Sequence, residues 1–524
     1  MKKATTKRLS IILTVMFALF TFIGCSPKSK KAEASSIDQT REMIFAASRD
    51  QAPGEKDAHY CTINLGVWEP LVTKDEDGNP APALAESWES NDARTEWTFK
   101  LKKDVKFSNG TPFNSDIVVK NFDRYKKGPF PSSFYGMNIE TTYPGLKDVV
   151  AIDENTVKLT FSKANPMLTY TMANFGSSIF EPSCFAEDGN FKEMAIGTGP
   201  YKLVENVVGE YCVIEKNENY HGDAPTLQKL KFRVISDANT RYSALLSGEV
   251  HGLCDLGAIT PSLAAELEKN KDFTVSVGDS GITHFLNVNG NKFPFNDIKM
   301  REGLSLLLDR EEIINEFYNG YGLPAGAFLN YTSPFYKKID AVHNAEKGKK
   351  LIKEVIGDKE VNLEFILPTG DCNRYPYEEE AVYIQSLLSE VGINSNITVF
   401  EWGKCKEMMK SGSYDMCLKI QGLPSADPFG LFKGYMHSKG GSNIGYGLGY
   451  KNDHVDELIK NASNELNMDK RKSIYDELQD ISSKDFPNIP VMYSQEVVAC
   501  SSKVKGYKAT PYGLTGYTQV EWAE

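Results

Sequence analysis

The chain has 524 residues, of which 41% are hydrophobic and 25% are charged, and its formal net charge is −11. This length is too great for one compact core, so we expect several subdomains, and the composition excludes a mostly disordered chain. The negative net charge argues against a nucleic-acid partner, because nucleic-acid binding usually needs a basic face.

A short hydrophobic segment lies near the start of the chain. Basic residues precede an apolar run over 9–23, which is shorter than the roughly 20 residues that a membrane-spanning helix needs. This pattern predicts a signal peptide over 1–24. The run ends at Gly24 and Cys25, a junction that resembles the lipobox of bacterial lipoproteins. The resemblance implies that Cys25 is lipidated and that 25–36 forms a tether to the outer face of the cell membrane; a plain secretory signal is the alternative.

The remaining cysteines are scattered through strand-like and helix-like segments. None forms a C-x-x-C pair, which argues against a structural zinc site, and no cofactor is expected. One or two disulfides remain open in an extracytoplasmic protein, although the sequence cannot pair the cysteines. No later segment is long and apolar enough to span a membrane, so attachment would come from the lipid alone.

Several segments of the first half are predicted to be half-buried strands. Polar and apolar side chains alternate in them, and turn residues such as the Asp-Gly-Asn-Pro run at 77–80 punctuate the chain. Trp88 and Trp97 are placed as core side chains of a sheet. The predicted strands are 42–47, 96–101, 156–161 and 230–235.

The second half is richer in helical periodicity. A helix is predicted over 299–318, where apolar side chains fall on one face. Another helix, over 378–391, lies between strand-like segments at 361–366 and 396–400, which is the order of a βαβ unit in an α/β protein. Two further amphipathic helices are predicted, over 454–466 and 471–481.

Five groups of segments together resemble one family, the peptide, opine and nickel class (family 5) of extracytoplasmic solute-binding proteins. Each group is weakly specific, but their order along nearly the whole chain is specific. Gly197 and Gly199 in the third group suit a tight crossover with unusual backbone angles. The groups are 68–72 with 82–88, 97–101 with 105–113, 197–203 with 217–220, 286–289 with 300–305, and 486–491.

The resemblance implies a fold, a partner and a mechanism. The expected fold is α/β, of the type II periplasmic-binding-protein kind, with two hinged lobes of mixed sheet and an inserted third domain. A monomer that closes on a small ligand and docks on the permease and ATPase subunits of an ABC importer is implied. The implied boundaries are lobe one at 37–66, 195–272 and 489–524, the inserted domain at 67–194, and lobe two at 273–488.

The ligand class stays divided between short peptides and metal chelates. The segments 106–110 and 422–428 look more like the nickel branch of the family. Dipeptide binders of the family carry an Asp, which neutralises the peptide amino group, at the position that is Pro424 here. Nickel binders, in turn, typically bring arginines from the segment matching 172–185, which contains none in this chain.

Five residues are candidate ligand contacts. His437 would be a metal ligand if a chelator supplied the others, although a surface histidine is an equal alternative. Arg374 would clamp a carboxylate with two parallel hydrogen bonds, or would be a solvated loop residue. Tyr60 and Trp402 would wall the cleft, with core packing as the alternative for the tryptophan. Tyr435 lies beside His437 in the same segment and is included with it.

Catalysis is not expected. Residues 278–281 imitate part of a serine-protease signature, but Ile282 follows and no histidine segment completes a triad. No zinc-protease, esterase-elbow or phosphate-loop motif is found. An exported hydrolase, or a ligand sensor or chaperone on the same fold, are the alternatives to a transport function.

Overall fold

The computed structural model describes residues 37–52, 65–75, 77–127, 139–173, 177–192, 194–422, 427–510 and 517–523. The predicted lipidation site Cys25 and the predicted contact Tyr60 lie outside these ranges. Residues 1–37 and 38–524 form separate units, and the second is the one described below. No helix in the described ranges combines the length and apolar character needed to cross a membrane.

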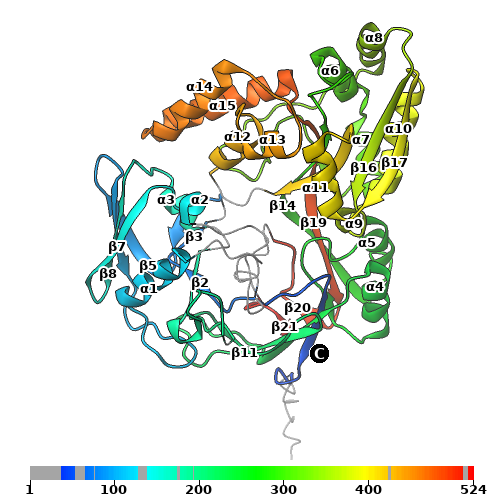
Figure 1. Ribbon diagram of the computed structural model, residues 1–524. Helices are drawn as coiled ribbons and strands as arrows, with labels where there is room; N and C mark the ends of the chain where they lie inside the picture. The colour runs from blue at the N-terminus through cyan, green and yellow to red at the C-terminus, as the bar shows by residue number, and fades with distance from the viewer. Residues whose placement is uncertain are drawn as a thin grey trace, which may run out of the picture. The chain divides into compact units, whose positions relative to one another are not determined.

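An 11-stranded mixed sheet is the largest element of the described chain (Figure 1). Its strands follow the order β10-β11-β12-β1-β13-β19-β14-β18-β16-β17, and β15 pairs with β19 off this path. The strands are β1 (Met43–Ala47), β10 (Tyr201–Val207), β11 (Tyr211–Lys216), β12 (Lys229–Val234), β13 (Gly252–Leu253), β14 (Phe273–Val288), β15 (Gly322–Pro324), β16 (Val361–Pro368), β17 (Ile393–Phe400), β18 (Met416–Gly422) and β19 (Ile489–Ser501).

Two long strands, β14 and β19, connect the two parts of this sheet and lie side by side in Figure 1. Their antiparallel register shifts between Asp279 and Thr283, so the pairing is interrupted in the middle of both strands. One end of β19 (Val497 to Ala499) packs in a core with Leu253 of β13, and the other end (Ile489 to Met492) packs in a different core. The crossing strands therefore belong to two separately packed regions.

A four-stranded antiparallel sheet has a core of its own. Its order is β5-β6-β8-β7, with α1 packed on it, and Trp97 and Phe99 of β6 are buried in that core. Its strands are β5 (Ala85–Ser90), β6 (Glu96–Leu101), β7 (Leu146–Asp153) and β8 (Thr156–Phe161). Short pairs flank it: β2 (Glu69–Pro70) with β9 (Ser178–Ile179), and β3 (Val72–Lys74) with β4 (Pro80–Pro82); elsewhere β20 (Val504–Lys505) pairs with β21 (Glu521–Trp522). The domain boundaries given above stay a prediction.

Several helices begin where an Asp or Asn side chain accepts a backbone N–H group, as at Asn114, Asp237, Asp309 and Asn467. The helices are α1 (Ser115–Tyr125), α2 (Ile139–Thr142), α3 (Leu168–Met172), η1 (Pro182–Cys184), α4 (Ala238–Ser247), α5 (Pro261–Leu267), α6 (Ile298–Leu307), α7 (Arg310–Tyr318), α8 (Ala345–Ile356), α9 (Thr369–Cys372), α10 (Tyr377–Ser389), α11 (Trp402–Ser411), α12 (Phe429–Tyr435), α13 (Gly441–Gly445), α14 (Asp453–Asn464) and α15 (Met468–Asp485).

The predicted βαβ unit is confirmed, whereas the single helix over 299–318 is wrong. Strands β16 and β17 pair in parallel and α10 connects them. The helical segment breaks at Leu308, which is extended, and Asp309 then caps α7 by accepting from the Glu312 N–H at 3.0 Å. Both halves bury an apolar face in one core, so periodicity alone did not reveal the break.

Gly197 and Gly199 are required for a reason other than the predicted one. Neither has a positive φ angle. A Cβ at Gly197 would lie 2.0 Å from the Val67 carbonyl oxygen, and one at Gly199 would lie 2.4 Å from the Gly66 carbonyl oxygen. Close backbone approach, rather than unusual dihedral angles, therefore excludes side chains there.

Candidate functional site

A rigid loop follows β13 at the edge of the crossing strands. Asp255 occupies the left-handed region (φ +77°), which is uncommon for a residue with a side chain. The fully buried Arg241 of α4 donates hydrogen bonds to the carbonyls of Gly257 at 3.1 Å and Ala258 at 3.0 Å, and also to those of Ile235 and Ser236. These bonds fix the backbone of the loop 255–258.

Asp255 forms a bidentate ion pair with Arg49. The Arg49 Nε and Nη2 atoms donate to the two carboxylate oxygens at 2.7 and 2.8 Å, and the Asp255 side chain is only 2% exposed. Burial alone would raise the pKa of Asp255, but the Arg49 charge and hydrogen bond outweigh burial and lower it. The loop therefore presents a neutralised pair.

Arg374 approaches this loop from the other region of the sheet. It lies between α9 and α10 and is half-buried. Its stem covers Gly257, because a Cβ added at Gly257 would lie 2.9 Å from Cβ and 3.0 Å from Cγ of Arg374. Within the described ranges, the guanidinium has neither a hydrogen bond nor an ion pair, although Asp255 and Glu496 interact with it electrostatically. A guanidinium in this setting can bind a carboxylate.

Glu496 is a half-buried acid on β19, opposite Gly278 and next to the register shift. Among the described residues it has no hydrogen-bond or ion-pair partner. Burial raises its pKa well above the usual value, and the negative charge of Asp255 adds to the rise, while Arg49 and Arg374 oppose it. Glu496 and Arg374 therefore attract each other electrostatically without a direct ion pair or hydrogen bond among the described residues.

Three aromatic side chains form a row next to Lys419. Trp402, Tyr446 and Tyr435 follow one another, with ring centroids 6.3 and 5.8 Å apart. The Lys419 ammonium lies 4.9 Å from the Tyr446 ring and donates to the Ile420 carbonyl at 2.8 Å. Asp371 accepts from the Ile420 N–H, and burial raises its pKa while Lys419 and Arg374 oppose the rise.

His437 contacts residues that do not belong to this aromatic row. Its Nδ1 accepts from the Lys439 N–H at 3.0 Å and lies 3.7 Å from a carboxylate oxygen of Asp456 on α14. Its Nε2 has no hydrogen-bond partner in the described part of the chain. No group of three or more His, Cys, Asp or Glu side chains among the described residues could hold a metal ion.

A buried polar network lies behind Arg374. Tyr377 and Tyr318 direct their hydroxyls to Nδ1 of His284, at 3.1 and 3.3 Å, and Tyr318 donates to Glu380 at 2.7 Å. Burial lowers the pKa of His284 to about 3 and raises the pKa of Glu380 to about 7. Tyr375, the neighbour of Arg374, packs edge-on against His284. The turn that carries Arg374 is thus packed against titratable groups.

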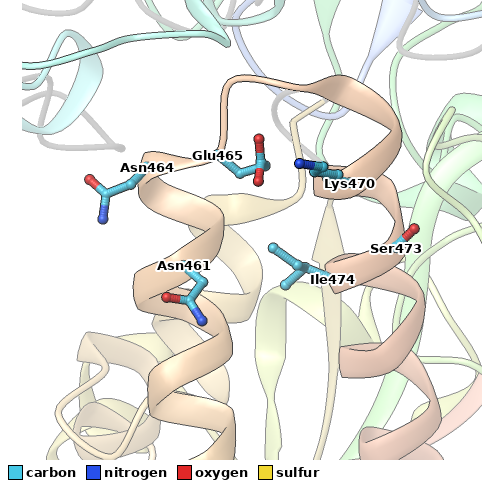
Figure 2. Close-up of a pocket in the computed structure, with 6 residues that line it drawn as sticks. All are labelled: Asn461, Asn464, Glu465, Lys470, Ser473 and Ile474. Carbon is cyan, nitrogen blue, oxygen red and sulfur yellow. The ribbon is translucent and has the colours of Figure 1, made fainter.

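A hollow of about 500 Å³ lies elsewhere, between the end of α14 and the start of α15 (Figure 2). Figure 2 shows Asn461 and Ile474 on facing sides of the two helices, with Glu465 and Lys470 at the turn. Glu465 caps the turn by accepting from the Asn467 N–H at 2.8 Å. The hollow has no aromatic lining, and we do not assign a ligand to it.

Of the predicted contacts, Trp402 and Tyr435 belong to the same aromatic row, whereas Arg374 lies against Gly257 of the loop 255–258. Tyr435 is buried, and its hydroxyl donates to the side-chain oxygen of Gln421. Sequence reasoning missed Asp255, Glu496 and Lys419. A signal existed for the last two, because each is the one charged residue of a largely buried strand.

The fold and this group of charges define a class: an α/β binding protein in which two packed regions share crossing strands and face each other through charged side chains. A family model for bacterial extracellular solute-binding proteins, family 5, matches residues 79–443. The probable D,D-dipeptide-binding periplasmic protein DdpA of Escherichia coli (strain K12) is 26% identical over 471 residues, which cover 86% of this chain and 87% of that protein.

Two further comparisons agree with this class. The nickel-binding periplasmic protein of the same organism is 30% identical over 294 residues, but these cover only 55% of each chain. The solved structure of the ABC transporter substrate-binding protein CtaP of Listeria monocytogenes superimposes with a TM-score of 0.81 at 24% identity, covering 93% of this chain and 100% of that one. The partial nickel match gives little support to the predicted nickel branch.

The chain belongs to the family 5 extracellular solute-binding proteins. Its fold is that of the type II periplasmic-binding proteins, as predicted. Proteins of this family are extracytoplasmic binding subunits of ABC importers and not enzymes. Membership of the family therefore excludes the alternative of an exported hydrolase.

Proposed function

We propose that the chain captures a short peptide outside the cell membrane and delivers it to the permease of an ABC importer. The observation that carries this proposal is the half-buried Arg374 guanidinium, which has no hydrogen bond or ion pair in the described ranges and lies against Gly257. A guanidinium offers two parallel N–H donors to a carboxylate, which is the chemistry of a peptide C-terminus. The long match to the probable D,D-dipeptide-binding relative supports the same ligand class.

The proposed mechanism is closure of one lobe on the other. Arg374 belongs to the predicted lobe two and lies against Gly257 of the predicted lobe one, and β14 and β19 would connect the two lobes. A ligand that binds both sides would favour the closed arrangement, which the permease would recognise. Tyr60, Trp402 and Tyr435 are proposed as the aromatic walls.

Native mass spectrometry of the protein purified from its host tests this function. We expect the spectrum to show bound short peptides of several masses, which dissociate from the protein on mild collisional activation. Uptake of labelled peptides by a deletion strain is the second measurement: reduced uptake supports an importer subunit, and unchanged uptake contradicts transport and favours a sensor or chaperone.

A metal chelate is the second candidate ligand, favoured by the open Nε2 of His437 and by the partial match to a nickel-binding relative. One imidazole suffices when a chelator supplies the other ligands. Metal analysis of the purified protein distinguishes this candidate, and His437→Ala should then weaken chelate binding at least tenfold. Unchanged chelate affinity would remove His437 from the site.

The proposed anchor is a lipid on Cys25, and the proposed state is a monomer. Labelling cells with a radioactive fatty acid should mark the wild-type protein and leave Cys25→Ala unlabelled. Light scattering should give the mass of one chain. An equally labelled variant, or a dimeric mass, would contradict the respective proposal.

A further inference from the structure

Arg374 and Glu496 are opposite charges that have no direct hydrogen bond in the described part of the chain. They lie next to a second pair, Arg49 and Asp255, that is directly hydrogen-bonded. The adjacent Arg49 and Asp255 neutralise each other through two short hydrogen bonds. Arg374 and Glu496 interact electrostatically, yet they form neither an ion pair nor a hydrogen bond with each other or with other described residues. Partly buried charged groups without hydrogen bonds are costly, so the arrangement is more favourable once a ligand supplies the missing hydrogen bonds.

The position of Glu496 supports a ligand contact rather than a structural role. It lies on a crossing strand whose neighbouring positions, Val497 and Val498, are buried in an apolar core, and it faces Gly278, which has no side chain. An acid that served the scaffold would be bonded to backbone or to a cation, as Asp255 is. Glu496 therefore offers its full hydrogen-bonding capacity to a guest.

We propose that Glu496 binds the ammonium group of a zwitterionic ligand whose carboxylate is bound by Arg374. The inference rests on the proposed function and narrows it to compact zwitterions, either a free amino acid or a dipeptide with an unblocked amino group. Dipeptide binders of the family carry an Asp at the position of Pro424, and here Glu496 would supply the acceptor for the amino group from a different element.

The surroundings of Glu496 make a second consequence testable. The charged and titratable groups that act on it are Arg49, Asp255, Arg374, Tyr375 and Tyr507. Because burial raises the pKa of Glu496, this carboxyl gains its proton at a higher pH than an ordinary glutamate, and a protonated carboxyl carries no charge for an ammonium group. Affinity for the zwitterion should therefore fall as the pH is lowered.

The experiment measures binding of four probes by calorimetry: free alanine, free dialanine, N-acetyl-dialanine and dialanine amide. We expect the wild type to bind a free form at least tenfold more tightly than the acetylated form, with the better of the two free probes identifying the size of the ligand. In Glu496→Gln, the affinity for the free form should fall at least tenfold, and the variant should no longer bind the free form more tightly than the acetylated form. The control Glu215→Gln, on β11 of the same sheet, should behave as the wild type.

The outcomes distinguish the role of Glu496 from the peptide-binding function of the chain. If the wild type binds free dialanine and Glu496→Gln binds it equally well, the role of Glu496 is wrong while the peptide function stands. If the wild type binds none of the four probes and carries no peptide from its host, both are wrong. Thermal unfolding of Glu496→Gln verifies folding, and the wild-type preference for the free over the acetylated probe tests the inference without any variant.

Discussion

The loop 255–258 and the Arg374–Glu496 pair face each other but satisfy their charges differently. In the loop, Arg241 donates to the carbonyls of Gly257 and Ala258, and Arg49 neutralises Asp255. Arg374 and Glu496 have no such partners in the described chain. The difference teaches that buried charge serves two purposes here: compensated charge holds the backbone in shape, and uncompensated charge is available to a ligand. The predictions below rank residues by their effect on the free energy of unfolding.

The largest loss of stability is expected for Arg241→Met. The substitution leaves the carbonyls of the loop without donors in a buried setting, which should lower the free energy of unfolding by about 3–5 kcal/mol. Urea denaturation measures the change. Arg233→Met, which removes a partly exposed arginine paired with Glu249, is the control and should cost about 0.5 kcal/mol. Equal costs for the two variants would contradict the role of Arg241.

A smaller loss is expected for Asp255→Asn. Asn tolerates the left-handed backbone, so the substitution isolates the charge, and we expect a loss of about 2 kcal/mol at pH 7. Because the folded pKa of Asp255 is lowered, its stabilisation is present above the usual carboxylate pKa and is lost as the pH falls through the lowered value. Denaturation at pH 7 and pH 3 should show a large and a small difference from the wild type; a constant difference would contradict the charge argument.

A change of similar or smaller size, but of opposite pH dependence, is expected for Glu380→Gln. Folded Glu380 keeps its proton up to about pH 7, whereas the unfolded chain releases it near pH 4.5. The folded state then binds more protons in this window, so the wild-type free energy of unfolding falls as the pH rises. Relative to the wild type, the Gln variant should gain about 2 kcal/mol between pH 5 and pH 8.

His284 has the opposite linkage, because its folded pKa of about 3 lies below its usual 6.5. Its contribution is the same in both proteins and cancels in the difference between Glu380→Gln and the wild type. Parallel urea titrations across the pH range would reveal a flat difference if Glu380 were ionised in the folded protein.

The smallest change of stability is expected for Arg374→Gln. Gln keeps the carbons that cover Gly257 and removes a guanidinium without a partner, so the free energy of unfolding should change by less than about 0.5 kcal/mol. Peptide affinity should nevertheless fall about 10- to 100-fold. The affinity of Arg374→Lys should lie between those of the wild type and Arg374→Gln. A stability loss comparable to that of Asp255→Asn would place Arg374 in the scaffold instead.

Local pattern predicted much of the secondary structure. The strands 96–101 and 156–161 agree with β6 and β8, and the helix between two strands is α10 between β16 and β17. Alternation and helical periodicity are properties of neighbouring residues, so they survive folding. The break at Leu308 was missed because both halves of the segment face the same core.

The sequence by itself determined the fold class and the family, because hydrophobic periodicity and the order of short motifs are written along the chain. It also predicted Arg374, Trp402 and Tyr435 as ligand contacts, which stays a prediction, but it could not show which of their polar groups are hydrogen-bonded. Only the tertiary structure decided that Arg49 compensates Asp255, while Arg374 and Glu496 have no hydrogen bond or ion pair with any residue that the structure describes. These four residues are far apart in the chain, and whether a charge is compensated depends on distances that exist only after the strands and loops have packed.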